Sequence, residues 1–267
     1  MRLRHLTAFL FALPCLLLPL LGDAATPSPR IIGGEDAPEG RYPFMVSLQV
    51  PEIDGPTPRD KHYCGGTLIA PSWVLLANHC FVTNAKRWTI RLGSTDLNDP
   101  NARELEIASI HRPGPFDFDR DIALVRLATP VSDVTPVRLI GVAGSGYEAP
   151  GYPMMAVGWG ASGADQVPER LQHVQVPFIA LAQCQAMWGD SALHPENAMC
   201  AGTPTRGACG GDSGGPLLVN DGQGWIQLGI VSRGPRGCVN RPKPSVFMRL
   251  AGPEIHGFIQ QTLADNP

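Results

Sequence analysis

Short apolar runs, separated by turn-forming residues, follow one another along the chain from residue 44 onward. Runs of about four to eight residues bounded by Gly, Pro, Asn or Asp are typical of β-strands, because helices need longer segments with a different period. In the first half the pattern predicts strands at 44–50, 66–70, 73–77, 88–92, 105–110 and 122–127. In the second half it predicts strands at 154–157, 174–179, 216–219, 225–232 and 246–250.

The two groups of strands are separated by residues 128–151, which are rich in Pro, Gly and Ser and poor in large apolar side chains. Only the C-terminal tail has a helical pattern. There, apolar residues recur at the spacing of one helix face, at Ile255, Phe258, Ile259 and Leu263. The 30 Gly and 27 Pro residues favour many turns over long helices. The pattern therefore predicts an all-β protein of two β modules with one terminal α-helix.

The first thirty residues have the features of a targeting segment. Arg2 and Arg4 precede an apolar run at 6–21, and small residues follow this run, so we expect a secretory signal peptide over residues 1–24. A retained membrane anchor is the alternative, but the run is short and is broken by prolines. Lipid attachment at Cys15 is disfavoured because apolar residues continue after it.

A proline-rich segment at 25–30 follows and ends in Arg30. Such backbone is stiff and exposed, so cleavage after Arg30 would create a new amino terminus at Ile31. We therefore expect an activation propeptide at 25–30, with a simple linker as the alternative.

Charge and cysteine content limit the partners and the compartment. The net charge is −3 and the seven His residues are scattered, so neither nucleic acid nor a membrane surface is indicated as a partner. Once Cys15 is removed with the signal peptide, an even number of Cys residues remains, which indicates disulfides in an oxidising compartment. None lies in a C-x-x-C pair, which disfavours metal binding, and the sequence leaves 15 pairings open. These residues are Cys64, Cys80, Cys184, Cys200, Cys209 and Cys238.

One hydroxyl, that of Ser213, lies in a glycine-rich stretch at 208–217. Glycines on both sides permit a tight loop whose N–H groups can approach the carbonyl oxygen of a substrate. A surface turn is the alternative interpretation, because Gly, Asp and Ser also dominate turns.

A serine nucleophile needs a base, and histidine has a suitable pKa for this role. His79 is the best candidate because it ends the apolar run at 73–77 and precedes Cys80, although a structural histidine is the alternative. Asp121 leads directly into a buried-looking strand and is the best carboxylate to orient the imidazole. Asp117 and Asp119 are better explained as a solvated acidic loop.

Five motifs occur in the order of one known family: Ile31-Ile-Gly-Gly, Ala77-Asn-His-Cys80, Asp121-Ile-Ala-Leu, Gly158-Trp-Gly160 and Gly211-Asp-Ser-Gly-Gly-Pro216. Over residues 31–267 the chain thereby resembles the chymotrypsin-like (trypsin-fold) serine endopeptidases. The resemblance implies two packed six-stranded antiparallel β-barrels, at about 31–131 and 132–252, followed by a C-terminal α-helix at about 253–266.

The resemblance also implies roles for individual residues. Ser213 would attack the peptide carbonyl, His79 would carry the proton and Asp121 would orient His79. The N–H groups of Gly211 and Ser213 would hold the oxyanion. After cleavage at Arg30, the carboxylate of Asp212 would pair with the new α-amino group of Ile31. The implied disulfides are Cys64–Cys80, Cys184–Cys200 and Cys209–Cys238.

The resemblance places the primary specificity pocket between Gly207 at its base and Gly234 and Ser245 on its walls. No acid stands at the base, so we expect medium apolar side chains such as Val, Ala, Leu or Met before the scissile bond, and not Lys or Arg. Ser232 precedes Arg233, which stands where the family normally carries tryptophan, so we expect Arg233 to favour acidic residues upstream of the cut.

Two further positions depart from the family pattern. Asn78 stands where the family usually has alanine, which adds bulk and a polar group behind the imidazole. Ser94 stands where one acid of the family's calcium loop would be expected, so we expect no metal site, and no cofactor is expected either.

The predicted function is that of a secreted serine endopeptidase, extracellular or periplasmic, made as a zymogen and acting as a monomer. Its partners would be a protein or peptide substrate, an activating protease and protein protease inhibitors, with no nucleic acid and no membrane after signal removal. A non-catalytic binding protein on the same fold is the alternative. An α/β-hydrolase with Ser213, Asp221 and His256 is a further one, disfavoured because Pro216 leads into a strand where that fold needs a helix.

Overall fold

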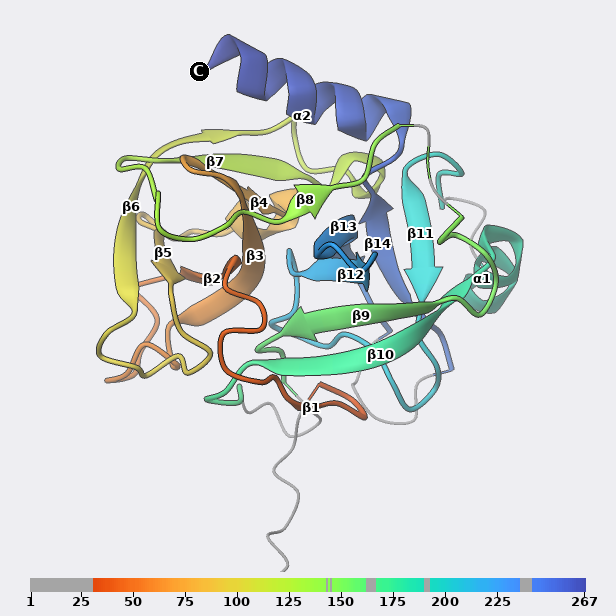
Figure 1. Ribbon diagram of the computed structural model, residues 1–267, viewed down its shortest axis with the longest axis horizontal. Helices are drawn as coiled ribbons and strands as arrows, with labels where there is room; N and C mark the ends of the chain where they lie inside the picture. Colours follow the sequence, from red (N-terminus) through yellow and green to blue (C-terminus); the bar gives the residue numbers. More distant parts are fainter. Residues whose placement is uncertain (1–30, 143, 145, 162–166, 190–192, 236–241) are drawn as a thin grey trace, which may run out of the picture.

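The computed structural model describes residues 31–142, 144, 146–161, 167–189, 193–235 and 242–267. The predicted all-β fold with a C-terminal helix is confirmed, and Figure 1 shows its two sets of strands side by side. The first set closes into a six-stranded antiparallel barrel in the order β2-β3-β4-β7-β6-β5. Its strands are β2 (Met45–Gln49), β3 (His62–Ala70), β4 (Trp73–Leu76), β5 (Thr89–Leu92), β6 (Arg103–His111) and β7 (Ala123–Leu127).

The second barrel also closes through six antiparallel strands, because β9 pairs with both β10 and β12 at the ends of the path β10-β11-β14-β13-β12-β9. Two short strands extend this sheet: β1 pairs with β10, and β8 runs parallel to β13. The strands are β1 (Glu35–Asp36), β8 (Arg138–Leu139), β9 (Pro153–Gly158), β10 (Gln172–Ile179), β11 (Ala198–Ala201), β12 (Pro216–Asn220), β13 (Trp225–Arg233) and β14 (Ser245–Arg249).

The apolar pattern explains the shape of the first barrel. On β6, Glu104 and Glu106 are exposed, whereas Leu105 and Ile107 pack against the core, as the two-residue period of a strand requires. Strand β4 is buried along its whole length. Strand β4 therefore has a continuous apolar run, whereas the half-buried β6 alternates.

The helices differ in part from the prediction. Helix α2 (Pro253–Asp265) begins at the expected proline and lies at the top edge of Figure 1. The expectation that only the tail is helical was wrong, because α1 (Leu181–Trp188) is also an α-helix. It is only eight residues long and buries Cys184 alone among its residues, so its sequence has no apolar face with a helical period. Tertiary contacts, including the disulfide to Cys200 on β11, hold it in place.

Five shorter elements also escaped the sequence pattern, because segments of two to four residues carry no readable period. They are the strands β1, β8 and β11, of which β8 lies inside the connection at 128–151, and two 3₁₀ turns, η1 (Asn78–Phe81) and η2 (Phe118–Arg120). The turns bear on the candidate site, because η1 contains His79 and η2 ends directly before Asp121.

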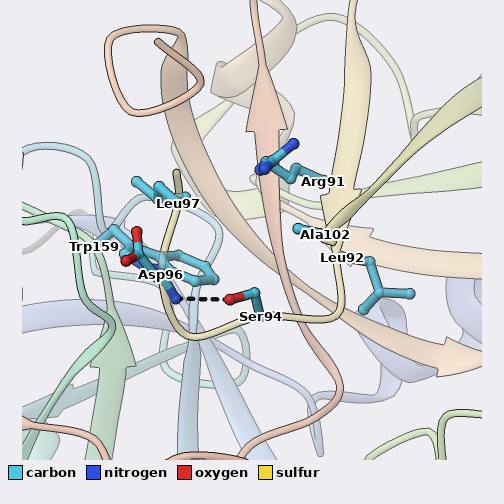
Figure 2. Close-up of a pocket in the computed structure, with 7 residues that line it drawn as sticks. All are labelled: Arg91, Leu92, Ser94, Asp96, Leu97, Ala102 and Trp159. Atoms are coloured by element: carbon cyan, nitrogen blue, oxygen red, sulfur yellow. Dashed lines mark hydrogen bonds between the residues drawn. The ribbon is translucent and has the colours of Figure 1, made fainter. Parts of the chain in front are cut away.

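A loop of the first barrel, directly after β5, contacts the second barrel. Its Thr95 carbonyl accepts hydrogen bonds from the backbone N–H of Leu171 at 2.7 Å and from the indole N–H of Trp159 at 3.1 Å. Figure 2 shows the Trp159 ring beside this loop, where the Asp96 N–H donates to the Ser94 hydroxyl at 2.9 Å. These contacts tie the loop of the first barrel to the strands of the second.

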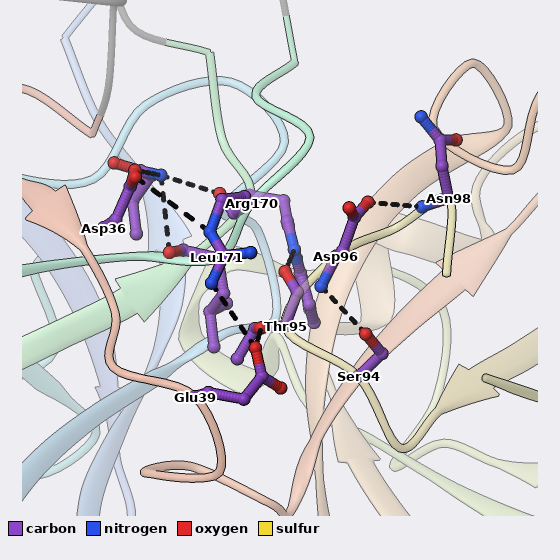
Figure 3. A network of polar contacts seen from close by, with 10 residues as sticks. Asp36, Glu39, Ser94, Thr95, Asp96, Asn98, Arg170 and Leu171 are labelled. Atoms are coloured by element: carbon purple, nitrogen blue, oxygen red, sulfur yellow. Dashed lines mark hydrogen bonds and ion pairs between the residues drawn. The ribbon is translucent and has the colours of Figure 1, made fainter. Parts of the chain in front are cut away.

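Ion pairs reinforce the same junction. A side-chain nitrogen of Arg170 lies 3.3 Å from a carboxylate oxygen of Glu39, and another lies 4.0 Å from one of Asp36. Figure 3 shows Arg170 with these two acidic side chains. Glu39 also accepts a hydrogen bond from the hydroxyl of Thr95. The orientation of the two barrels is therefore held by both backbone and side-chain contacts.

Candidate active site

His79 and Asp121 come together between the two barrels. The imidazole Nδ1 lies 2.7 Å from Asp121 Oδ2, and the backbone N–H of His79 donates to Asp121 Oδ1 at 2.9 Å. The Asp121 side chain is fully buried, whereas that of His79 is 25% exposed. The carboxylate thus fixes both the position of the His79 backbone and the orientation of its ring, and this pair does not use Nε2.

A third hydrogen bond to the Asp121 carboxylate was not foreseen. The hydroxyl of Ser232, on β13, donates to Asp121 Oδ2 at 2.6 Å. A buried carboxylate is stable only when its oxygens are hydrogen-bonded, and here donors from both barrels share the task. Ser232 was predicted to line the substrate site, and the structure places its hydroxyl behind the triad candidates.

The loop that carries Ser213 is held by backbone contacts to both barrels. The Ser213 carbonyl accepts from the N–H of Gly65 on β3 at 2.8 Å, and the N–H of Gly214 donates to the carbonyl of Val231 on β13 at 2.8 Å. Gly214 has φ of +80°, and a Cβ there would lie 3.1 Å from the backbone nitrogen of Ala77, two residues before His79. The glycine is required both by its conformation and by this close approach. Ser213 is therefore fixed beside the segment that carries the imidazole.

A buried chain of hydrogen bonds supports the same loop. The Nε2–H of His62 donates to the Gly211 carbonyl at 3.0 Å, because a carbonyl can only accept. Its Nδ1 must then accept from the hydroxyl of Ser47 at 2.6 Å, and Ser47 accepts from the amide of Gln49 at 2.6 Å. Burial lowers the pKa of His62 to about 4, although the Gly211 carbonyl acts in the opposite direction. The imidazole is therefore neutral, as this chain of donors requires.

The sequence offered no signal for this support, because Ser47, Gln49 and His62 lie on strands with no motif around them. Pairing of β2 with β3 brings them together, with Gln49 opposite His62.

Asp212 is buried in a cradle of backbone groups. One carboxylate oxygen accepts from the N–H of Gly160 at 2.8 Å, and the other accepts from the N–H of Cys209 at 2.7 Å. A Cβ at Gly158 or at Gly160 would overlap the carboxylate, which explains why glycines flank the tryptophan of that motif. Ile31 is 1% exposed, and the next residue, Ile32, forms a bridge with Gly207.

The predicted pocket residues Gly207 and Ser245 are brought together. Ser245 is fully buried on β14, and its hydroxyl accepts from the N–H of Ala208 at 3.2 Å. Gly207 is also buried, whereas Gly234 is exposed. Gly207 and Ser245 thus bring a glycine and a buried hydroxyl to this region, and neither position carries an ionised side chain.

The side chain of Asn78 contacts the backbone of the segment that leads to Asp121. It is buried, and its amide donates to the carbonyl of Gly114 at 3.4 Å, in the segment that leads to Asp121. Asn78 therefore contacts that segment, and the geometry of His79 and Asp121 is preserved.

Two of the three expected disulfides are formed, Cys64–Cys80 and Cys184–Cys200. Cys209 is also disulfide-bonded, and Cys238, the partner expected for it, lies outside the described residues. Among the described residues, one group of His, Cys, Asp or Glu atoms has a spacing suited to a metal, at Cys64, His79 and Cys80. Both sulfurs belong to a disulfide, so the group does not form a metal site.

Residues 31–254 match the family model described as Trypsin. The chain belongs to the trypsin family. A protein of Mus musculus named Serine protease 56 is 37% identical over 250 residues, which cover 89% of this chain. The chain spans only 39% of the length of that relative. Membership of the trypsin family places the protein in the class of serine proteases. The two β-barrels described above agree with this family.

The alternative of an α/β-hydrolase is wrong, because Ser213 precedes strand β12 in a barrel and is not followed by a helix. Among the described residues, none of the helices combines the length and apolar character needed to cross a bilayer.

Proposed function

We propose that this member of the trypsin family is a secreted serine endopeptidase that uses Ser213, His79 and Asp121. The observation that carries the proposal is the 2.7 Å contact between His79 Nδ1 and the buried Asp121 carboxylate, beside a loop that fixes Ser213. A histidine held in this way presents Nε2 as a base toward a serine.

The reaction follows from these positions. His79 takes the proton of Ser213 as its oxygen attacks the peptide carbonyl, and the N–H groups of Gly211 and Ser213 stabilise the oxyanion. His79 then returns the proton to the leaving amine, which departs and leaves an acyl-enzyme. Water attacks this ester, with His79 again acting as the base, and regenerates the free serine.

We further propose that the chain is a zymogen. Its signal peptide would be 1–24 and its propeptide 25–30, both outside the described residues. Cleavage at Arg30–Ile31 would free the α-amino group of Ile31, whose side chain is already buried. The carboxylate of Asp212 would pair with this α-amino group. The backbone cradle of Asp212 supports this role, because it aims a carboxylate into the interior directly next to Ser213.

The pocket supports a preference for neutral side chains. Gly207 and Ser245 would leave space for Val, Ala, Leu or Met before the scissile bond, whereas a buried Lys or Arg would lack a counter-ion there. Such an enzyme would not cut efficiently after its own Arg30, so a separate protease would activate it.

One experiment tests the catalytic proposal. Protein cleaved at Arg30–Ile31 should be labelled by a serine-acylating reagent and should hydrolyse peptides ending in Val, Leu or Met faster than those ending in Arg. Ser213→Ala and His79→Ala should each lower turnover by at least about a thousand-fold, and the double variant should be little worse than either. A Ser213→Ala protein that keeps most of its activity would show that another group performs the reaction.

A second experiment tests activation. The Arg30→Gln precursor should stay uncut and nearly inactive, whereas the wild-type precursor should gain activity when a trypsin-like protease is added. Full activity of the uncut Arg30→Gln precursor would overturn the zymogen proposal. Rapid self-activation of the wild type would instead overturn the proposed pocket specificity, because the enzyme would then cut efficiently after Arg30.

A further inference from the structure

A cavity of about 280 Å³ lies between α1 and the end of β10. Figure 1 shows α1 beside β10 and β11, at the edge of the second barrel. The candidate catalytic residues His79, Asp121 and Ser213 do not line it. Apolar side chains form most of its wall, namely Pro177, Phe178, Ile179, Met187, Pro204 and Pro244. The cavity thus offers an apolar surface that the proposed catalysis does not use.

The wall that α1 contributes is tied to the barrel at two points. Cys184, within the helix, is bonded to Cys200 on β11. At the last residue of the helix, the indole N–H of Trp188 donates to the carbonyl of Pro244 at 3.3 Å, and the ammonium of Lys243 donates to the carbonyl of Trp188 at 3.1 Å. Because these contacts hold the helix apart from the end of β10, the cavity is formed before any ligand binds.

One cation lines this apolar cavity. It is Lys243, whose ammonium lies 4.9 Å from the ring centroid of Trp188. An ammonium group has three N–H donors, and the Trp188 carbonyl accepts from one of them. Among the described residues, no carboxylate forms an ion pair with Lys243, and the described lining residues include no Asp or Glu. Two donors and a positive charge are therefore available to a ligand.

The cavity adjoins the proposed primary specificity pocket but is distinct from it. Pro244 directly precedes Ser245, and Gly202 directly follows Ala201, the residue that pairs with Ser245 between β11 and β14. Neither Ser245 nor Gly207 lines the cavity, and the hydroxyl of Ser245 accepts instead from the N–H of Ala208. The cavity therefore shares two segments with that pocket without sharing the residues that define it.

We propose that this cavity binds an amphiphilic monocarboxylate, a medium-chain fatty acid, with its alkyl chain against Ile179, Met187 and Pro204 and its carboxylate on the ammonium of Lys243. Each methylene group that leaves water favours binding, and a single ammonium at an apolar site favours a single negative charge. The volume of 280 Å³ is that of about nine water molecules in the liquid, and a methylene group is of similar size, so a chain of about eight carbons fills it. This proposal goes beyond the protease function and does not depend on it.

The experiment measures the binding of octanoate by isothermal titration calorimetry. The protein carries Ser213→Ala, so that self-digestion is removed, and Ser213 does not line the cavity. Octanoate should bind at least about thirty-fold more tightly than butanoate, because it buries four more methylene groups. It should bind about five-fold more tightly than the neutral 1-octanol, and this second ratio should approach one at high salt.

Two pairs of variants locate the ligand. Lys243→Gln should lower the affinity for octanoate about five-fold and leave that for 1-octanol unchanged, whereas Lys86→Gln, at an exposed lysine that does not line the cavity, should change neither. Met187→Asp places a carboxylate in the apolar wall and should weaken both ligands at least about ten-fold. Ala186→Asp is its matched control, because Ala186 is the preceding residue of α1, is exposed and does not line the cavity.

Several outcomes would overturn the proposal. Absence of octanoate binding, or equal affinities for octanoate and 1-octanol, would contradict it directly. Unchanged binding in Met187→Asp would show that the ligand lies elsewhere, for example in the proposed primary pocket. An equal loss in Lys86→Gln or Ala186→Asp would assign the effect to net charge.

The folding of each variant is checked by circular dichroism. If Met187→Asp does not fold, Lys243→Gln decides the matter, because an unchanged octanoate affinity in that variant contradicts the site. Labelling of Ser213 and peptide hydrolysis are measured separately, so failure of the ligand site leaves the protease proposal intact, and failure of the protease proposal leaves the ligand site intact.

Discussion

His62 should make the folded protein lose stability as the pH falls from about 6.5 to about 4. Its imidazole is buried between Ser47 and the Gly211 carbonyl, and burial lowers its pKa from the ordinary value of 6.5 to about 4. Between these values the unfolded chain binds a proton that the folded chain excludes. Acidification therefore favours unfolding. The stabilisation that comes from the neutral His62 is fully present only above the pKa that this histidine has in the unfolded chain. The difference between the two pKa values corresponds to about 3 kcal/mol at pH 4.

The perturbation that tests this reasoning is His62→Gln in a Ser213→Ala background, where self-digestion is removed. Glutamine keeps an amide donor for the Gly211 carbonyl and cannot take up a proton. Denaturant unfolding would be followed by circular dichroism and tryptophan fluorescence at pH values from 8 to 4. From pH 8 to pH 4, the protein with His62 should lose about 3 kcal/mol more than the His62→Gln variant does.

His62→Gln also lowers the free energy of unfolding at every pH, because glutamine packs imperfectly in place of the imidazole. The comparison therefore uses the change in unfolding free energy with pH and not its absolute value. His256→Gln changes a partly exposed histidine on α2 and should keep the wild-type slope. His173, whose pKa is also lowered, first by burial, contributes in the same direction to every variant and cancels in the comparison. Equal losses of unfolding free energy with and without His62 would refute the argument.

Three further changes test the support of the site. Gly214→Ala should lower the free energy of unfolding by at least about 2 kcal/mol, because φ is +80° and the new Cβ would lie closer than 3.0 Å to a backbone oxygen. Gly222→Ala is the control, because Gly222 has a similar φ of +87° but open space around its Cβ position, and it should cost less. Equal melting temperatures of the two variants would contradict this prediction. Ser232→Ala removes one donor from the buried carboxylate and should cost about 1.5–3 kcal/mol in urea unfolding, so an unchanged midpoint would show that the bond contributes nothing. Replacing Cys184 and Cys200 together by Ala opens a loop with a sequence separation of 16 and should cost about 3 kcal/mol, measured against the same protein with the disulfide intact.

The sequence by itself determined the features that depend on neighbours along the chain. Short apolar runs bounded by turn-forming residues predicted most strands, because a strand that packs in a core needs apolar residues that are close together along the chain. The spacing of Ile255, Phe258 and Ile259 predicted α2, because a helix shows one apolar face with a period of 3.6 residues. The motif around Ser213 was readable for the same reason, since a tight loop needs its glycines at consecutive positions. Resemblance to the family then indicated His79 and Asp121 as its partners.

Only the tertiary structure decided which distant side chains meet. Packing of the two barrels against each other places His62 against Gly211, and the packing of α1 sets Trp188 beside Arg233. Neither contact follows from a local pattern, because residues brought together by strand pairing and barrel closure can lie far apart along the chain. The short α1 belongs to the same class, since eight residues without an apolar face are helical only where a disulfide and neighbouring strands hold them. Local periodicity specifies the secondary-structure elements. The closed and packed barrels decide which polar groups are buried and which neighbours form hydrogen bonds with them.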